Sequence, residues 1–290
     1  MQNSAGEPAP GLRAAWDQAA TRIDRLDARL LLQAATGCDH ATLIAHPNAP
    51  ITSAAWKEFQ TCVERRAAGV PLAYLDGWTE FYGLHLRINP SVLIPRQETE
   101  LLVELGLQRC AKLGNTGNER LSLLDLGTGS GAIAIALSKK YPEMQCTGVD
   151  NSAAALALAR ANADRYKLNI RWLLSDWYTS LAGERFHLIV ANPPYIAAGD
   201  PYLQADGLPH EPQQALVAEE NGLAALRYII SSAPQYLHPS GYLLFEHGFD
   251  QAEACRATLS AAGFSAINSH KDLSGNWRVT VGRLCTTDSS

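Results

Sequence analysis

The feature that most constrains the fold of this chain is a regular alternation of strand-like and helix-like segments, which begins near residue 98. Five apolar strand patterns occur in this region, at residues 121–127, 146–150, 170–176, 186–192 and 241–248. Most segments between them have apolar residues at helical spacing. Such alternation predicts a mostly parallel sheet with helices on both faces. Two last strands, near Ile267 and Val279, follow each other without a helix and are expected to pair antiparallel at one edge. We therefore predict an α/β fold with a seven-stranded, doubly wound, Rossmann-like sheet.

The N-terminal part of the chain has a different pattern. From Leu12 to about Gly69 the apolar residues recur at helical spacing. Asp39 and Thr52 are candidate N-caps, and Gly37 is a candidate C-cap. One apolar stripe is formed by Ile23, Leu26, Leu30, Leu31 and Ala34. These signals predict a small bundle of about four helices.

A bridging segment connects the two parts. Residues 80–82 and 84–88, on either side of Gly83, are typical of a short β-hairpin. We therefore predict three regions. They are an N-terminal helical domain at residues 1–75, a β-hairpin linker at 76–92 and a large α/β domain at 93–290.

A glycine-rich turn, DLGTGSG, lies where the first strand of the predicted sheet gives way to a helix. Its glycines allow a sharp turn and a close approach of the backbone to a ligand, and the helix that follows offers free N–H groups. The candidate ligand-binding residues of this turn are Gly127, Thr128, Gly129, Ser130 and Gly131. Tight packing of helix on strand would also explain the glycines, so the turn alone is weak evidence.

Acidic and aromatic residues stand at the ends of the next two strands. Asp150 ends the second strand, about twenty residues after the glycine turn, where a carboxylate can bind both hydroxyls of a ribose. Asp176 and Trp177 end the third strand. Each carboxylate could instead cap a helix, but together these residues favour a nucleoside ligand at the carboxyl edge of the sheet.

The fourth strand runs directly into Asn192, Pro193, Pro194 and Tyr195. The side-chain oxygen of Asn192 and the backbone oxygen of Pro193 are two acceptors that can hold a planar NH2 group by both hydrogens. Tyr195 can stack on the flat group that bears the NH2, and the stiff Pro193-Pro194 backbone orients the acceptors in advance. Such a site needs no strong base if the electrophile is a sulfonium methyl group. A simple turn after a strand is the alternative interpretation.

Composition excludes several other functions. The net charge of −5 makes a nucleic-acid partner a poor expectation. Six cysteines without a C-x-x-C pair indicate free thiols, and eight histidines without metal-ligand spacing predict no metal site. The N-terminus has no signal pattern, and no apolar run is long enough to cross a bilayer. We expect a soluble cytoplasmic protein.

In this order, DLGTGSG, Asp150, Asp176-Trp177 and NPPY resemble class I S-adenosylmethionine-dependent methyltransferases that modify planar nitrogens. Four further stretches resemble one branch, the release-factor glutamine N5-methyltransferases (the PrmC/HemK family): PLAYLDGWTEFYGLHLRINPSVLIPRQETE, HEPQQALVA, LLFEHGFDQ and GNWRVTVGR. The resemblance covers nearly the whole chain from about Asp24.

This resemblance implies an activity and a partner. The enzyme would methylate the glutamine of the Gly-Gly-Gln motif in class 1 peptide chain release factors, and residues 1–75 would recognise that protein. The cofactor would contact the glycine turn, Asp150, Asp176, Trp177 and Asn192, while residues 192–195 would hold the glutamine amide. Phe81 and the turn at 94–96 would flank the methionine end of the cofactor. Relatives often carry Arg-Phe-Glu-Pro after NPPY, whereas this chain has Leu208-Pro209-His210-Glu211-Pro212 and lacks the arginine that would contact the substrate.

Several alternatives stay open. Glutamine methylation of a ribosomal protein, or methylation of an exocyclic amine in DNA or RNA, would use the same chemistry. A nicotinamide oxidoreductase would explain the glycine turn but not NPPY. A non-catalytic adaptor would leave the intact set of site residues unexplained. Glu246-His247, at the end of the fifth strand, is expected to be a hydrogen-bonded structural pair. We expect a monomer.

Overall fold

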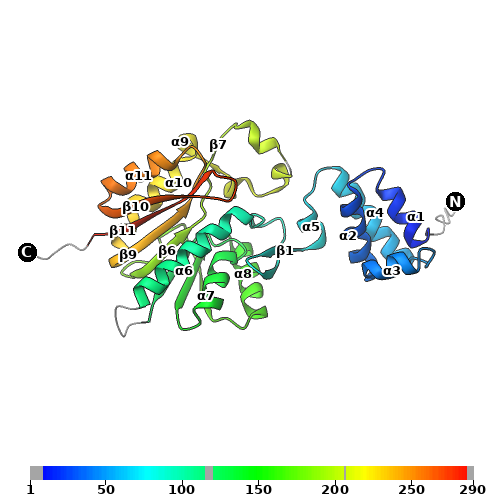
Figure 1. The fold of residues 1–290 in the computed structure, drawn as a ribbon, viewed down its shortest axis with the longest axis horizontal. Coiled ribbons are helices and arrows are strands. Elements are labelled where there is room, and N and C mark those ends of the chain that lie inside the picture. Colours follow the sequence, from blue (N-terminus) through cyan, green and yellow to red (C-terminus); the bar gives the residue numbers. More distant parts are fainter. Residues whose placement is uncertain (1–8, 115–119, 206, 286–290) are drawn as a thin grey trace, which may run out of the picture. The chain divides into compact units, whose positions relative to one another are not determined.

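The computed structural model contains a central seven-stranded sheet (Figure 1). Its strands are β3 (Ser122–Leu126), β4 (Gln145–Asp150), β5 (Ile170–Leu174), β6 (Phe186–Ala191), β9 (Leu237–Glu246), β10 (Phe264–Lys271) and β11 (Trp277–Leu284). Their order is β10-β11-β9-β6-β3-β4-β5, and the five strands from β9 to β5 are parallel. The predicted mostly parallel sheet is therefore confirmed. The last two strands pair antiparallel at one edge as predicted, with β11 inserted between β10 and β9.

Helices cover both faces of this sheet (Figure 1). They are α6 (Glu100–Gly114), α7 (Ala132–Lys140), α8 (Ala153–Arg165), α10 (Ala224–Ser232) and α11 (Ala252–Ala261). Leu123 packs in one hydrophobic core with residues of α6 and α7, whereas its neighbour Leu124 packs in a second core with residues of α10 and α11. Successive strand residues point to opposite faces, so the central strands must be apolar on both sides.

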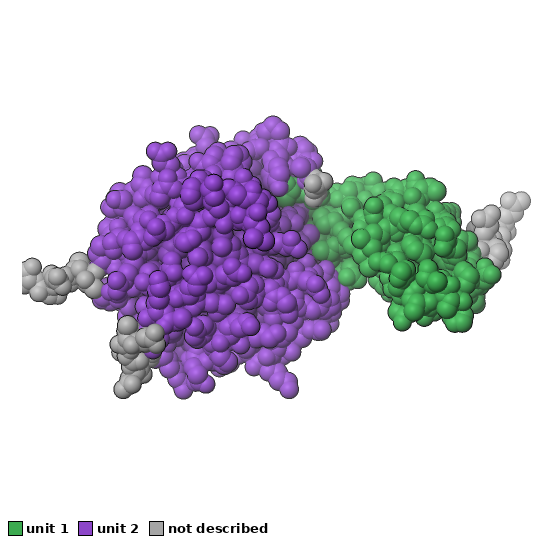
Figure 2. Space-filling view, in the orientation of Figure 1, with its two compact units in different colours: residues 1–77, 206–210 green, residues 78–205, 211–290 purple. Residues whose placement is uncertain are grey.

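The structure describes residues 9–114, 120–205 and 207–285. The chain divides into two units, residues 1–77 with 206–210 and residues 78–205 with 211–290 (Figure 2). By this division the hairpin belongs to the second unit, and a short segment after the NPPY turn belongs to the first. The predicted domains also include residues 1–8 and 286–290, which lie outside the described residues. None of the described helices is long and apolar enough to span a membrane.

The first unit is helical, as predicted. Its helices are α1 (Leu12–Ala19), α2 (Arg25–Thr36), α3 (His40–Ala45), α4 (Ser53–Ala67) and the short α5 (Leu72–Asp76). The predicted caps are confirmed: the side chain of Asp39 accepts a hydrogen bond from Thr42 N (2.8 Å), and that of Thr52 accepts one from Ala55 N (3.2 Å). Gly37 ends α2 in the left-handed conformation, with φ of 70°.

The apolar stripe predicted for α2 is only in part the buried face of this helix. Leu26 and Leu30 are 52% and 38% exposed. The buried residues are Ala28, Leu31 and Leu32, of which only Leu31 belongs to the stripe, and they pack with α1 and α4 residues in the core of the unit. Apolar residues occur on both sides of this helix, so their spacing alone did not identify its buried face.

The predicted hairpin is present as β1 (Trp78–Phe81) and β2 (Leu84–Arg87), joined by a tight turn in which Tyr82 and Gly83 have positive φ. Asn162 of α8 connects it to the glycine turn. Its side chain accepts a hydrogen bond from Arg87 N (2.7 Å) and donates to Arg87 O (3.1 Å) and to Ser130 O (2.9 Å). Because Asn162 is completely buried, these bonds fix one wall of the site.

The segment after β6 frames the opposite wall. Two short strands, β7 (Ile196–Ala197) and β8 (Val217–Ala218), pair in parallel and enclose a loop between them. The four-residue α9 (Glu219–Gly222) follows β8. This loop returns the chain to the pocket at Pro212, Gln214 and Ala215.

Candidate active site

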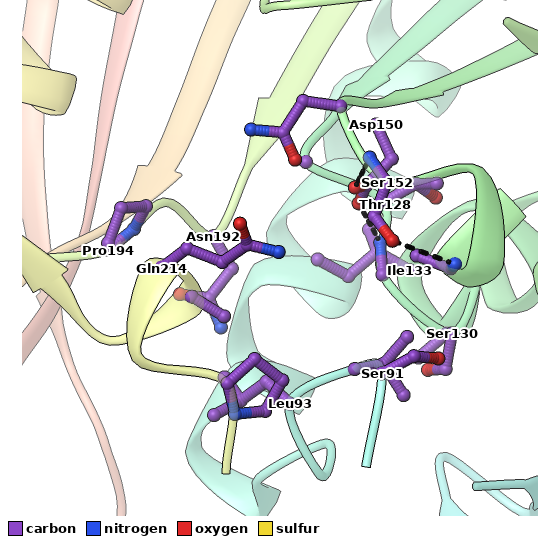
Figure 3. Close-up of a pocket in the computed structure, with 18 of the residues that line it drawn as sticks. Ser91, Leu93, Thr128, Ser130, Ile133, Asp150, Ser152, Asn192, Pro194 and Gln214 are labelled. Atoms are coloured by element: carbon purple, nitrogen blue, oxygen red, sulfur yellow. Dashed lines mark hydrogen bonds between the residues drawn. The ribbon is translucent and has the colours of Figure 1, made fainter. Parts of the chain in front are cut away.

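A pocket lies at the carboxyl ends of β3, β4 and β6, where the direction of strand order reverses (Figure 3). This is the place where doubly wound sheets bind their ligands. The pocket contains about 930 Å³ of empty space and opens to solvent. Among its lining residues are ten of those predicted from the sequence: Pro95 of the turn at 94–96, Gly127, Thr128, Gly129, Ser130, Asp150, Asp176, Trp177, Asn192 and Pro194.

The glycine turn forms the floor of the pocket, and its backbone requires glycine. Gly127, Gly129 and Gly131 all have positive φ, at 67°, 55° and 81°. A Cβ on Gly131 would also lie 3.1 Å from Trp172 and 3.2 Å from the Cβ of Ala159. The sequence-based interpretation of tight helix packing therefore applies to Gly131, which does not line the pocket. Gly127 and Gly129 do line it, and a ligand can approach their backbone closely.

Asp125 lies beneath the turn and is completely buried. Its Oδ2 accepts hydrogen bonds from Thr128 Oγ1 (2.6 Å) and Ala134 N (3.2 Å), while Oδ1 has no partner among the described residues. Burial raises the pKa of this carboxyl to about 7, although the bonds from Thr128 and Ala134 oppose the rise. The turn is thus held by a carboxyl group that is costly to ionise.

The titration of Asp125 predicts a pH dependence of stability. Its folded-state pKa lies above the ordinary value of 3.8, so its contribution is fully present below about pH 4 and is lost as the pH rises through about 7. We expect Asp125→Asn to remove this loss, which amounts to at most about 4 kcal/mol. Urea unfolding of both proteins at several pH values between 4 and 8 measures it. The prediction fails if the difference in unfolding free energy between the two proteins is independent of pH.

Asp150 lies at the end of β4 and lines the pocket. Its Oδ2 accepts a hydrogen bond from Gly129 N and its Oδ1 accepts one from Ser152 N, both at 2.9 Å. Burial raises the pKa of this carboxyl, against these two backbone bonds. Asp150 therefore holds the glycine turn in place, and each oxygen keeps a lone pair for a ligand hydroxyl.

We expect Asp150→Asn to weaken binding of S-adenosylmethionine by about 10- to 100-fold, because the amide has one acceptor fewer and no charge. Isothermal calorimetry gives the dissociation constant directly. Asp164→Asn, on the exposed side of α8, is the matched control and should leave the constant within about twofold. Equal affinities of the Asp150 and Asp164 variants would remove Asp150 from the ligand site.

Trp177 stands beside the glycine turn. It has a φ of 48°, which is unusual for a bulky side chain, and it lines the pocket together with Ser175 and Asp176. A Cβ on Gly127 would lie 3.4 Å from Cζ3 of Trp177, so the indole ring lies directly against this turn. The ring offers a flat apolar wall for a base.

The NPPY turn begins where β6 ends. Asn192 and Pro194 line the pocket, and Figure 3 shows Asn192 across the pocket from Asp150 and Thr128. Asn192 Nδ2 donates a hydrogen bond to Thr99 Oγ1 (3.1 Å). Pro193 and Tyr195 do not line the pocket, and the hydroxyl of Tyr195 donates to Glu246 Oε1 (2.9 Å). The pocket therefore brings Asn192 beside the candidate cofactor residues.

Two further sequence-based expectations concern residues close to the pocket. Phe81 does not line the pocket, because it is 1% exposed and packs in the hydrophobic core. Glu246 and His247 do not bond to each other. Glu246 bonds to Thr99 and Tyr195, whereas His247 bonds to Gly248 O and to Thr280 Oγ1. Adjacent strand residues point to opposite faces, so they meet different neighbours.

The structure adds pocket residues that sequence reasoning did not single out. They are Ser91, Val92, Leu93, Thr99, Ala132, Ile133, Asn151, Ser152, Ala155, Ser175, Pro212, Gln214 and Ala215. Most of them are small or apolar and carry no chemical signature. Thr99 and Gln214 stand in stretches that carry the family resemblance, IPRQETE and HEPQQALVA, and that position was the one available signal.

The segment at residues 208–212 places the carboxylate of Glu211 where it joins two loops. Glu211 has a completely buried side chain, accepts a hydrogen bond from Ile94 N (3.0 Å) and forms an ion pair with Arg96. Pro95, which lies between Ile94 and Arg96, lines the pocket, and so does Pro212, which follows Glu211. Glu211 therefore connects the two loops that form this side of the pocket. No described group of three or more His, Cys, Asp and Glu side chains could hold a metal ion, and all six cysteines are free thiols.

Comparison with known proteins agrees with this geometry. A family model described as "PrmC N-terminal domain" matches residues 13–77, and one described as "Methyltransferase small domain" matches 109–207. The chain is 48% identical over 266 residues to a release factor glutamine methyltransferase of Xylella fastidiosa, covering 91% of this chain and 95% of that protein.

Solved structures share the fold at low sequence identity. The hMettl16 catalytic domain in complex with a MAT2A 3'UTR hairpin aligns with a TM-score of 0.54 and 16% identity, over 79% of this chain and 84% of that chain. A Thermus thermophilus 16S rRNA N2 G1207 methyltransferase, solved with AdoMet and guanosine, aligns with a TM-score of 0.50 and 20% identity, over 71% of this chain and 49% of that chain.

The sheet order and the pocket at its carboxyl edge define a class I methyltransferase. Within that class, the 48% identity to the Xylella fastidiosa protein, over 91% of this chain and 95% of that protein, identifies the family. The chain belongs to the release factor glutamine methyltransferase family.

Proposed function

We propose that this protein transfers the methyl group of S-adenosylmethionine to the side-chain N5 of the glutamine in the Gly-Gly-Gln motif of class 1 release factors. The observation that carries the proposal is the position of Asn192, which shares one pocket with Asp150 and the glycine turn. An amide acceptor beside a nucleoside-type site is the arrangement that amide methylation requires. The name of the curated relatives supports the choice of substrate.

The residues of the pocket fit this cofactor. The open backbone at Gly127 and Gly129 accommodates its amino-acid part, Asp150 offers oxygens to ribose hydroxyls, and Trp177 offers a flat wall to adenine. The bound cofactor would supply a sulfonium methyl group, which is already activated for transfer. The protein's task is then to position the nucleophile rather than to generate it.

Residues of the NPPY turn would perform this positioning. Asn192 Oδ1 and the backbone oxygen of Pro193 accept the two N–H bonds of the substrate amide. Holding both hydrogens draws the nitrogen lone pair out of conjugation and directs it at the methyl carbon. The bound cofactor would supply the methyl group to the nitrogen as its C–S bond breaks, and the extra proton on the nitrogen would then pass to water. Pro194 keeps the turn stiff, and Tyr195, whose hydroxyl donates to Glu246, anchors the end of the turn.

We further propose that the first unit recognises the protein substrate and that the enzyme works in the cytoplasm as a monomer without a nucleic-acid partner. Deletion of residues 1–75 should raise the KM for an intact release factor about tenfold or more. The KM should then equal that for a short Gly-Gly-Gln peptide, because the deletion removes only contacts outside the motif. Calorimetry with S-adenosylmethionine checks that the remaining part still folds. An unchanged KM with intact cofactor binding would make the unit a stabiliser only.

Mass spectrometry tests the proposed activity. A purified release factor is incubated with the enzyme and S-adenosylmethionine, and its peptides are analysed. We expect a mass gain of one methylene on the peptide with Gly-Gly-Gln, and no gain when that glutamine is replaced. Methylation of a ribosomal protein or of nucleic acid in a lysate, with none on the factor, would overturn the substrate assignment.

A further inference from the structure

A chain of hydrogen bonds connects the end of β9 to the NPPY turn. Glu246 Oε2 accepts from Thr99 Oγ1 at 2.7 Å, and Thr99 Oγ1 in turn accepts from Asn192 Nδ2 at 3.1 Å. The other carboxylate oxygen, Oε1, accepts from the hydroxyl of Tyr195 at 2.9 Å. Glu246 is 1% exposed and Thr99 is 3% exposed. One buried carboxylate thus holds both ends of the turn, Tyr195 directly and Asn192 through Thr99.

The chain of bonds has a fixed direction. A hydroxyl group has one hydrogen, and a carboxylate can only accept. Thr99 therefore gives its hydrogen to Glu246 and can only accept from Asn192. Of the two ends of the Asn192 amide, only the NH2 group can donate, so Nδ2 faces Thr99 and Oδ1 is the end left for another partner. Without this chain, a half-turn of the amide would present NH2 to the pocket.

That half-turn would oppose the proposed reaction, because an NH2 group cannot accept the N–H of a substrate amide. We propose that Glu246 and Thr99 are positioning residues, which act through Asn192 and Tyr195 to keep Oδ1 of Asn192 directed at the substrate glutamine. This inference rests on the proposed function for its catalytic consequence. The orientation of Asn192 is a property of the protein alone and can be tested separately.

Burying the carboxyl group of Glu246 costs free energy, which supports a role beyond packing. Burial raises the pKa of this carboxyl, and the bonds from Thr99 and Tyr195 together with the charge of Arg278 oppose the rise. Apolar residues of similar volume often replace buried charges without loss of stability. In its ionised form this side chain accepts at both oxygens, which sets the direction of the hydroxyl of Thr99.

Two substitutions at Thr99 separate the hydroxyl from the shape of the side chain. Thr99→Val keeps the shape and removes the hydroxyl, and we expect kcat to fall about 30-fold while the dissociation constant of S-adenosylmethionine stays within about threefold. Thr99→Ser keeps the hydroxyl and removes the methyl group, and should recover most of the wild-type kcat. In the Asn192→Ala background Thr99→Val should cause no further loss, because Thr99 acts through Asn192.

Side-chain amide NMR tests the same chain without any substrate. The NH2 signals of Asn192, assigned by their absence from Asn192→Ala, should shift in Thr99→Val and in Glu246→Gln but remain near their positions in Thr99→Ser. Unshifted signals in Thr99→Val would overturn the inference. So would a valine variant that is as active as the serine variant.

The two proposals fail in different ways. If the signals behave as expected and the wild-type enzyme methylates no release factor, the proposed function is wrong and the orientation of Asn192 stands. If the wild-type enzyme is active and Thr99→Val retains full kcat, the function stands and the positioning role is wrong.

Discussion

Replacing Asn192 with alanine should reduce kcat by about 10²- to 10³-fold, which is the typical cost of removing one preorganised polar group from a reaction centre. The substrate amide would lose one of the two acceptors that orient its nitrogen, while the other walls of the pocket stay in place. We therefore expect the dissociation constant of S-adenosylmethionine to change by less than about threefold. Single-turnover methylation of the Gly-Gly-Gln peptide and calorimetry measure the two quantities.

Asn268→Ala is a suitable control for this prediction. Asn268 lies exposed on the edge strand β10, and its amide donates to Ala266 O within its own strand. The same change of residue type there should leave both kcat and cofactor affinity unaltered. If affinity collapsed in Asn192→Ala, Asn192 would be a cofactor ligand first and the proposed role in holding the amide would be wrong.

Replacing Gly222 with alanine should destabilise the protein by about 3 to 5 kcal/mol. Gly222 has a φ of 84°, which L-residues adopt at a cost. An added Cβ would also lie 2.1 Å from the backbone oxygen of Tyr195 and 2.8 Å from Nε2 of Gln251. Gln251 Nε2 donates to that same oxygen (3.0 Å), so the clash would push directly on the NPPY turn. Denaturant unfolding gives the change in free energy.

Gly183→Ala separates the cost of the clash from that of the backbone conformation. Gly183 has a nearly equal φ of 80°, and a Cβ there would meet nothing within 4 Å. Its substitution should cost only about 1 kcal/mol. Equal losses for the two variants would show that the close approach of Gly222 to Tyr195 has no energetic consequence.

The framework of this fold could be predicted from local signals. Short apolar segments, alternating with helical patterns, gave the parallel sheet, and the absence of a helix before the last strand gave the antiparallel edge. The helix caps Asp39, Thr52 and Gly37 were equally readable, because a capping side chain bonds within three residues of itself. The buried face of α2 was not readable, since it depends on packing against other helices.

Some residues of the candidate site could likewise be predicted from local signals, and others could not. Gly127, Asp150, Trp177 and Asn192 could be placed together because each follows a parallel strand, and parallel strands end at one edge of the sheet. Phe81 was misplaced because its sequence position says nothing of the direction of its side chain.

What the sequence determined by itself is the set of chemical groups at the ends of successive strands, because strand periodicity and strand order are local or nearly local properties. Only the tertiary structure decided which other residues hold these strand-end groups in position. Glu246 lies 147 residues from Thr99 and 51 from Tyr195, and Glu211 lies 115 residues from Arg96. Such contacts have no signature in sequence spacing, since they form only when strands and loops from distant parts of the chain fold against one another.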